Sequence, residues 1–506
     1  MLSIVSTLGL TLAVTRGLPQ GDAGVFFAVT SLFLLATAVG QLGTNTGLVY
    51  FLSRARSLGT PGAYRMLYRT ATRPVLAVGV AMAVLLFAFA PQVADVVNPG
   101  YVEQSTGYLR VVALFIPLAS LENVTLAGTR GMGTMRPNVI TEQLVRPGLQ
   151  LLFVVVSVAL LEGWGLGLAW SVAYLPAAVL SFVYWRRVLA KATRPAPEPG
   201  PQAGPQPGPR PDPTAGPGPG PDAQVPTAPR RRDFWWFTGP RAAASVAQMA
   251  MQRLDIVLVA ALAGAVEAAI YTAATRFLVV GQTGQRAISL AVQPRIGEAL
   301  AVHDIDTAKR LYRVTTNWLM LVTWPTYLVF VFFGERLLSV FGKDYSAGHA
   351  VLLLLSLVML FATGCGMVTM VLNMAGRTSW NVMNVALSLG VQIGVDLWLI
   401  PDLGILGAAI GWAAGIVLAN LVPLLQIGIV YGLHPFGRTT VVTIALTCVC
   451  FAAVPGAAVA VLGEGWPSLV VSLTVGCVGY AAGLWWFRHT LHLTELANVR
   501  RRRRRG

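Results

Sequence analysis

The sequence predicts an all-α polytopic membrane protein with about fourteen transmembrane helices, arranged as two six-helix parallel repeats followed by two C-terminal helices. Three observations support this fold class. The 506-residue chain is 55% hydrophobic and only 11% charged, with a mean hydropathy of +0.65, whereas soluble proteins carry about 25% charged residues. Apolar runs of about twenty residues, long enough to cross a ~30 Å hydrocarbon core, recur along the chain. The two halves also share an ordered set of residues at a nearly constant spacing.

The apolar runs give the expected helices and the division of the chain. We place the helices at 1–17, 25–51, 74–94, 109–128, 139–161, 165–185, 240–263, 267–290, 313–334, 349–372, 381–400, 404–430, 439–462 and 467–487. The expected units are an N-terminal six-helix lobe at 1–190, a linker at 191–233, a C-terminal six-helix lobe at 234–432, two further helices at 433–490 and a basic tail at 491–506.

The repeat is visible as matched residues in the same order in both halves. The matches pair Leu67-Tyr68-Arg69 with Leu311-Tyr312-Arg313, Tyr101 with Tyr345, Gly133 with Gly376, Asn138 with Asn381, Asp22 with Glu267 and Gly165 with Gly404. The spacing between partners drifts only from 245 to 239 residues. Because six helices bring the chain back to its starting side, both repeats enter the membrane from the same side and are parallel. Duplicated membrane bundles usually belong to transporters, with the substrate path between the repeats.

Charge placement predicts the orientation. The basic residues gather in alternate connections: Arg54, Arg56, Arg65, Arg69 and Arg73; Arg130 and Arg136; Arg186, Arg187, Lys191, Arg194 and 230–232; Arg295, Lys309, Arg310 and Arg313; and 500–505. The other connections are short and mostly acidic. The positive-inside rule therefore places both termini in the cytoplasm, and this placement accounts for the net charge of +16 without a nucleic-acid partner.

Residues 193–232 are rich in proline and glycine and have no apolar period. Such a composition favours an extended cytoplasmic tether, although a proline-rich ligand for a docking domain remains an alternative. The run of arginines at 500–505 is expected to anchor the topology and to contact anionic lipid.

The motifs of several function classes are missing from the sequence. It has no nucleotide-binding loop, metal-ligand cluster or nucleophile elbow, and its outer loops are too short for a catalytic domain. The four cysteines lie in apolar runs at spacings that fit no metal site. We therefore expect neither an enzyme nor a cofactor or metal.

Ionisable residues inside the expected helices are the strongest functional signal, because charge is costly in lipid. Arg253 lies twelve residues before the turn near Ala265, and Arg276 lies eleven residues after it. At ~1.5 Å per residue both reach a similar depth, near the midplane. Two arginines at one depth would bind a phosphate or pyrophosphate. The alternative is that Asp255 neutralises Arg276 in a structural ion pair.

Amide side chains accompany these arginines. Gln248, Gln252 and Gln282 lie on the same hairpin, and Gln41 and Asn45 lie on the second helix, which is the repeat-equivalent of the eighth. Amides beside arginines suit a sugar phosphate. For any single amide, hydrogen bonding between helices is the competing interpretation.

Four further ionisable residues are candidates for coupling transport to an ion. Glu142 and Arg146 are four residues apart just before Pro147 and predict an intrahelical ion pair beside a kink. Glu122 and Asp396 stand as isolated carboxylates that would accept a proton or cation. Gln392, one turn from Asp396, is expected to hydrogen-bond to it.

Several segments resemble the polysaccharide-lipid flippase branch of the multidrug/oligosaccharidyl-lipid/polysaccharide (MOP) exporter superfamily. The similar segments are Thr15-Arg16-Gly17-Leu18, Gly21-Asp22-Ala23-Gly24-Val25-Phe26-Phe27, Leu42-Gly43 with Gly47-Leu48-Val49, Arg253-Leu254-Asp255-Ile256 with Tyr271 and Ala273-Ala274, and Thr129-Arg130-Gly131-Met132-Gly133-Thr134-Met135-Arg136-Pro137 with Glu142 and Arg146-Pro147. The last of these is similar to actinobacterial members. The similarity covers nearly the whole chain except the linker, and the ordered set carries it rather than any one motif. The long insert and the short first helix depart from the family.

The resemblance implies a MATE-like fold in the cell membrane of a bacterium and a role in cell-surface polysaccharide or lipopolysaccharide biosynthesis. Such proteins move polyprenyl-pyrophosphate-linked oligosaccharide between leaflets as two lobes rock about a cationic cavity. The implied partners are this substrate, membrane lipid and the polysaccharide polymerase or glycosyltransferases. Three alternatives stay open: a peptidoglycan-precursor lipid flippase, a multidrug/cation antiporter, and a scaffold of an envelope-synthesis complex that transports nothing.

Overall fold

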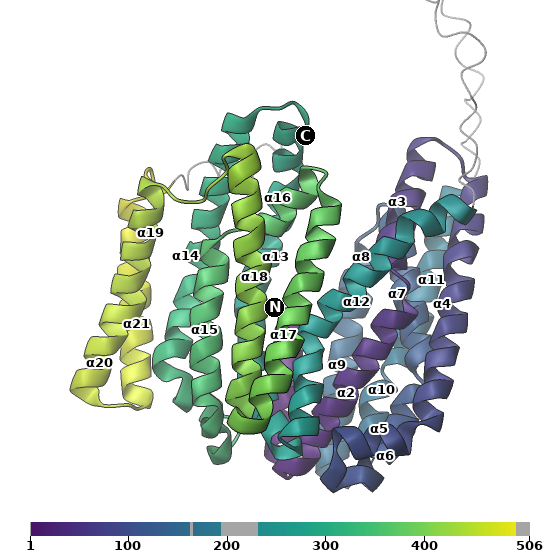
Figure 1. Ribbon diagram of the computed structural model, residues 1–506, viewed down its shortest axis with the longest axis horizontal. Coiled ribbons are helices and arrows are strands. Elements are labelled where there is room, and N and C mark those ends of the chain that lie inside the picture. Colours follow the sequence, from purple (N-terminus) through teal and green to yellow (C-terminus); the bar gives the residue numbers. More distant parts are fainter. Residues whose placement is uncertain (1, 162–164, 194–230, 492–506) are drawn as a thin grey trace, which may run out of the picture.

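The computed structural model describes residues 2–161, 165–193 and 231–491. Within these ranges the chain is helical and contains no strand, which confirms the predicted all-α class. Figure 1 shows the helices as two tilted bundles with a separate hairpin at one side. The predicted linker falls almost wholly outside the described residues, as does the tail at 492–506. At the linker's edges, α11 runs to Ala192 and α12 already begins at Arg231.

The N-terminal lobe contains thirteen described elements. They are α1 (Leu2–Gly17), α2 (Gln20–Gly40), α3 (Thr44–Ser57), α4 (Gly62–Ala88), α5 (Ala90–Val97), η1 (Pro99–Tyr101), α6 (Val102–Ala113), α7 (Ile116–Gly131), α8 (Arg136–Asn138), η2 (Val139–Val145), α9 (Arg146–Leu161), α10 (Leu166–Ser171) and α11 (Tyr174–Ala192), with η1 a single 3₁₀ turn between α5 and α6.

The second lobe and the terminal hairpin follow. The lobe contains α12 (Arg231–Leu262), α13 (Ala265–Ala301), α14 (Ile305–Ser339), η3 (Lys343–Gly348), α15 (His349–Gly364), α16 (Val368–Met374), α17 (Thr378–Leu403) and α18 (Ile405–Tyr431). The hairpin contains α19 (Arg438–Cys448), η4 (Val449–Ala453), α20 (Val454–Leu462) and α21 (Trp466–Trp486).

The exact count of fourteen spans is not confirmed. Among the described residues, eleven helices are long and apolar enough to cross a membrane, or twelve if the pair α6–α7, bent by 41°, forms one span. The apolar part of α1, Ile4–Gly17, is too short, and α13 is not among the helices that qualify. Each predicted run nevertheless coincides with helix.

Several predicted spans are interrupted or irregular, and two of these irregularities bear on the site. The run 25–51 divides into α2 and α3 at Leu42 and Gly43, whose φ angles of 49° and 68° are left-handed. A side chain on Gly43 would place Cβ 2.6 Å from the backbone nitrogen of Ala242, so the break brings the chain directly against α12. The run 139–161 begins as the π-helix η2 before continuing as α9.

Among the described residues, the most extensive apolar packing between the lobes lies at one end. The largest buried cluster takes residues from both lobes, including Phe33 of α2, Val259 of α12, Tyr271 of α13 and Leu355 of α15. At the other end the N-terminal lobe has its own cluster around Leu52, and the C-terminal lobe has another. Figure 1 shows the bundles meeting at the end of α5 and α6 and diverging toward α3 and α16.

Helix α12 crosses between the lobes. Its first turns pack on α3, where the Phe237 ring stacks on Tyr50 at 4.4 Å between centroids and Phe234 contacts Phe51. Its last turns belong to the shared cluster, through Ile256 and Val259. The start of this helix, which sequence placed at the edge of the second lobe, therefore packs on the first.

Candidate functional site

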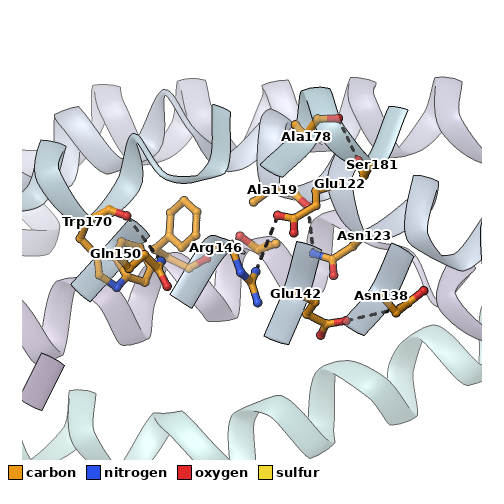
Figure 2. Close-up of polar contacts among 12 residues, drawn as sticks. Ala119, Glu122, Asn123, Asn138, Glu142, Arg146, Gln150, Trp170, Ala178 and Ser181 are labelled. Atoms are coloured by element: carbon orange, nitrogen blue, oxygen red, sulfur yellow. Dashed lines mark hydrogen bonds and ion pairs between the residues drawn. The ribbon is translucent and has the colours of Figure 1, made fainter. Parts of the chain in front are cut away.

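The N-terminal lobe holds a buried ion pair between two different helices. Arg146 Nη1 at the start of α9 lies 3.7 Å from Glu122 Oε2 on α7, and Glu122 is only 1% exposed. The guanidinium carbon of Arg146 also lies 5.1 Å from the centre of the Tyr174 ring. Figure 2 shows the two charged groups pointing toward each other between the helices. Two predictions are therefore wrong: Glu122 is not isolated, and Arg146 does not pair with Glu142.

The π-helix η2 explains why Arg146 pairs away from its own helix. The predicted pair with Glu142 requires α-helical spacing, in which residues four apart share a face. Residues 139–145 are π-helical, and π-turns wind i to i+5, so the two side chains lose that alignment. Glu142 Oε2 instead lies 3.5 Å from the amide nitrogen of Asn138 (Figure 2). Single π-turns inside α-helices are frequent at functional sites.

In the C-terminal lobe, Asp255 is held by a tyrosine rather than by an arginine. Asp255 is 2% exposed. Its carboxylate accepts hydrogen bonds of 2.8 Å from the Tyr271 hydroxyl and from the backbone N–H of Ile256. Among the described residues the only ion pair is Glu122–Arg146, so the alternative Asp255–Arg276 pair is not formed.

Neither Arg253 nor Arg276 forms an ion pair with a carboxylate of the described residues. Both are partly buried, and the Nε of each is buried with no hydrogen-bond partner. Arg253 lies nine residues before the end of α12 at Leu262, and Arg276 eleven residues after the start of α13 at Ala265. At ~1.5 Å per residue these are depths of about 14 and 17 Å. The two guanidinium groups thus lie at similar depth on adjacent helices.

Asp396 is buried against a glycine-lined face of α18. It is 1% exposed, and neither carboxylate oxygen has a partner among the described residues. A Cβ on Gly411 would lie 1.9 Å from Asp396 Oδ1, so the glycine leaves room for the carboxylate. With Gly407 and Gly415, this residue forms the small-residue spacing that lets membrane helices pack closely.

The expected Gln392–Asp396 hydrogen bond is not formed, because Gln392 reaches across to α12. Its Nε2 donates to the carbonyl of Met251 at 3.4 Å. Both α12 and α17 run toward the end where the lobes meet. Asp255 follows Met251 by four residues, and Asp396 follows Gln392 by four. One α-helical turn of ~5.4 Å on each helix therefore places the two carboxylates at the same level.

The predicted amides fall into two groups. Gln41 and Asn45 lie at the break between α2 and α3, where Asn45 Nδ2 donates to Gln41 Oε1 at 2.6 Å and Arg130 approaches Asn45 Oδ1 at 3.4 Å. These two amides are remote in sequence from Arg253 and Arg276, and their side chains already form hydrogen bonds within the N-terminal lobe. Gln248 and Gln252 are exposed on α12 and Gln282 is half-buried on α13, and none of these three makes a hydrogen bond with the described residues.

Sequence reasoning missed the tyrosines of the site. Tyr271 donates to Asp255, and Tyr174 packs on Arg146. Tyr327 is fully buried, and its hydroxyl has no partner among the described residues. An aromatic residue in an apolar helix normally indicates packing alone. The signal in the sequence was the tyrosine hydroxyl, because a buried tyrosine hydroxyl usually has a hydrogen-bond partner.

Comparison with known proteins finds a matching family model over part of the chain. The MatE family model matches residues 240–398, which include α13 to α16 and most of α12 and α17. No curated protein matches the chain at a significant level.

Solved structures share the fold. The lipid II flippase MurJ in an inward closed conformation has a TM-score of 0.68 at 12% identity, covering 96% of this chain and 97% of that one. A multidrug resistance MATE transporter of the MOP superfamily in an inward-facing conformation gives 0.63 at 14% identity, covering 85% and 94%. An outward-facing structure of such a transporter gives 0.53 at 15% identity, with the same coverage. The chain therefore has the MATE/MurJ-like fold.

Proposed function

We propose that this protein is a MOP-superfamily flippase that moves a polyprenyl-pyrophosphate-linked oligosaccharide across the cell membrane by alternating access of its two lobes. The observation that carries the proposal is the pair Arg253 and Arg276, which lie at similar depth on neighbouring helices and lack carboxylate partners within the described chain. A charge held inside a membrane protein without a partner is costly unless it contacts water or a ligand. A pyrophosphate supplies the missing anion.

A polar stripe on α12 supports a wet passage beside these arginines. Ser245, Gln248 and Gln252 are exposed at intervals of three and four residues, which places them on one face. Helix α21, by contrast, exposes residues such as Val470, Val478 and Trp485, as expected of a face in lipid. We therefore assign the α12 stripe to the water-filled space between the diverging lobes.

The proposed cycle follows from where the lobes touch. When the end at which the lobes diverge is open to the cytoplasm, the headgroup reaches the arginines. Their planar guanidinium groups bind phosphate oxygens through two parallel hydrogen bonds. Release on the other side requires the shared contact to separate. That contact includes Gly24 of α2, where a Cβ would lie 1.7 Å from the carbonyl oxygen of Ala265. Arg16 also donates across the lobes to the carbonyl of Val340 at 2.8 Å.

Candidate coupling groups lie in both lobes. Glu122 with Arg146 in the first lobe, and Asp255 with Asp396 in the second, are carboxylates whose protonation or cation binding would change the charge balance between lobes. The two carboxylates at one level in the C-terminal lobe favour the second candidate function, a multidrug/cation antiporter. A peptidoglycan-precursor flippase shares the pyrophosphate and the polyprenyl chain with our preferred substrate and is supported by the fold shared with MurJ.

The test is transport in reconstituted vesicles, with each substrate class measured on the same preparation. Wild-type protein should translocate lipid-linked oligosaccharide and not a cationic dye. Arg253→Ala/Arg276→Ala should abolish translocation while keeping its thermal stability, and Arg→Lys at both positions should restore only part of it, because lysine lacks the bidentate geometry. The matched control is Arg65→Ala/Arg69→Ala, which removes two exposed arginines from α4. Full transport by a stable Arg253→Ala/Arg276→Ala protein would refute the clamp, and dye transport would favour the antiporter.

Separate experiments test the proposed topology and partners. A single cysteine at Ala215, in the linker, should resist impermeant thiol reagents in intact cells if the linker is cytoplasmic, and labelling from outside would overturn the orientation. Shortening 200–228 to a brief flexible tether should leave transport intact. Loss of transport at normal protein level would instead indicate that the linker binds a polymerase, a glycosyltransferase or another essential partner, as the scaffold alternative requires.

A further inference from the structure

A second polar site lies far from the central arginines, between the start of α14 and the start of α19. It is a cavity of about 340 Å³ at the end of the molecule where the lobes diverge (Figure 1). Four basic side chains and one acidic side chain line it: Lys309, Arg310, Arg313, Arg438 and Asp306. The lining is completed by Val314, Asn317, Gly437, Thr439 and Thr440.

Two of the four cations are not engaged in the fold. Arg313 Nε donates to the carbonyl of His434 at 3.3 Å, and Lys309 lies against Gly432 at the end of α18, where the helix C-terminus attracts a cation. Arg310 and Arg438 are exposed and form no hydrogen bond or ion pair with the described residues. The cavity lining therefore carries a net positive charge even with the carboxylate of Asp306 included.

The N-terminus of α19 adds unpaired donors. This eleven-residue helix begins after Gly437, which supplies no side-chain cap. The N–H groups of Thr440 and Val441 turn back to the Gly437 carbonyl, and those of Arg438 and Thr439 remain free at the cavity wall. Free N–H groups and the helix dipole together favour an anion at this position.

A buried amide in the cavity wall has no hydrogen-bond partner for its oxygen. Asn317 is only 2% exposed, yet its Oδ1 has no hydrogen-bond partner among the described residues. A buried acceptor without a donor destabilises the fold. A hydroxyl group on the ligand would donate a hydrogen bond to Asn317 Oδ1. The site therefore favours an anion that also carries a hydroxyl.

Two exposed apolar side chains adjoin the lining residues in the sequence. Phe436 is 55% exposed and Val441 is 67% exposed, and both flank the lining residues along the chain. A soluble anion would gain nothing from these side chains, whereas acyl chains would cover them.

We propose that the cavity binds the headgroup of an anionic, hydroxyl-bearing glycerophospholipid such as phosphatidylglycerol. Its phosphodiester lies between Arg310, Arg438 and the start of α19, and its hydroxyl donates to Asn317. The lipid thereby joins the terminal hairpin to the C-terminal lobe.

Native mass spectrometry of the full-length protein, titrated with phosphatidylglycerol or phosphatidylcholine in detergent, tests the proposal. Wild-type protein should retain phosphatidylglycerol selectively. Arg310→Gln/Arg438→Gln should weaken this binding about thirtyfold, since each basic residue contributes separately to the attraction of an anionic lipid. The control Arg65→Gln/Arg69→Gln removes two exposed charges from α4, outside the cavity lining, and should retain the lipid. Equal loss in both variants would show general charge attraction and overturn the site.

A second variant separates binding from folding. Gly437 has an extended φ of −172°, and a Cβ there meets nothing within 4 Å. Gly437→Asp should therefore cap α19 and keep or raise stability, while its carboxylate occupies the free N–H groups and repels the phosphodiester. The expected result is unchanged stability in phosphatidylcholine and loss of the stabilisation by phosphatidylglycerol. Retained stabilisation would refute the site.

Two soluble probes distinguish the source of the anion. Inorganic phosphate and glycerophosphoglycerol, the deacylated headgroup, are added in place of lipid. Neither should displace phosphatidylglycerol at matched concentration, because neither covers Phe436 and Val441. Displacement by either probe would show that the cavity takes a soluble anion and would overturn the lipid assignment. These measurements do not involve transport, so their outcome is independent of the proposed flippase activity.

Discussion

The two lobes treat their buried charges in opposite ways. In the N-terminal lobe, Arg146 has a carboxylate at 3.7 Å and an aromatic ring against its guanidinium group. In the C-terminal lobe, Arg253 and Arg276 have no carboxylate within ion-pair distance, and Asp255 is held instead by Tyr271. The sequence predicts that the lobes repeat one pattern, yet only in the N-terminal lobe does a carboxylate pair with a buried arginine in the described structure.

This difference indicates where a ligand acts. A paired arginine is satisfied by the fold, so its removal should affect stability first. An unpaired arginine is not satisfied by the fold, so its removal should affect binding first. The following predictions test that division, from the largest expected effect on stability to the smallest.

Breaking the N-terminal ion pair should be the most damaging change. Glu122→Ala leaves Arg146 without its counter-charge and should lower the free energy of unfolding by about 3–5 kcal/mol. Glu122→Leu combined with Arg146→Met should recover most of the loss, because no buried charge remains. The matched control is Glu142→Gln, which should change stability by less than about 0.5 kcal/mol. Thermal unfolding in nanodiscs measures all three, and equal effects of the Glu122 and Glu142 variants would contradict the assignment.

Filling the space beside Asp396 should be the next largest effect. Gly411→Ala places a methyl group 1.9 Å from Asp396 Oδ1 and should cost about 1–3 kcal/mol through overpacking. Gly394→Ala on the facing helix α17 meets nothing within 4 Å and should stabilise by up to about 1 kcal/mol. If both substitutions are tolerated equally in thermal unfolding, the close α17–α18 contact does not hold the carboxylate.

The tyrosine that holds Asp255 provides a smaller test. Tyr271→Phe removes the donor to a buried carboxylate and should cost about 1–2 kcal/mol. Tyr327 offers a control on the neighbouring helix α14, since its hydroxyl is buried without a partner in the described structure and Tyr327→Phe should be neutral or slightly stabilising. A loss of the same size in both variants would show that the Tyr271–Asp255 hydrogen bond contributes nothing specific.

The smallest effect is expected at the contact that keeps the lobes together. Arg16→Ala removes the hydrogen bonds to the carbonyls of Val340 and Ser339 and should cost about 0.5–1 kcal/mol. The consequence is a two- to fivefold rise in the outward-open population, measurable as spin-label distances between the lobes. Arg54→Ala, which removes an exposed arginine of α3 without a hydrogen bond in the described structure, should leave the distances unchanged. Identical distance distributions in the wild-type, Arg16→Ala and Arg54→Ala proteins would show that the Arg16 contact does not hold the lobes together.

The sequence by itself determined the helical class, the approximate position of each apolar span and the set of intramembrane charges. These follow from hydropathy along the chain and from the cost of charge in lipid, both of which are local properties. The similar depth of Arg253 and Arg276 also followed, because it depends only on counting residues from a turn.

The tertiary structure decided which of these groups meet. Arg146 pairs with Glu122 and not with Glu142 because a π-helix changes the phase of its own helix and a neighbouring helix presents a nearer carboxylate. Gln392 reaches Met251 rather than Asp396, and α12 begins on the first lobe, for the same reason. A partner depends on the rotation and register of adjacent helices, and spacing along one helix does not encode either.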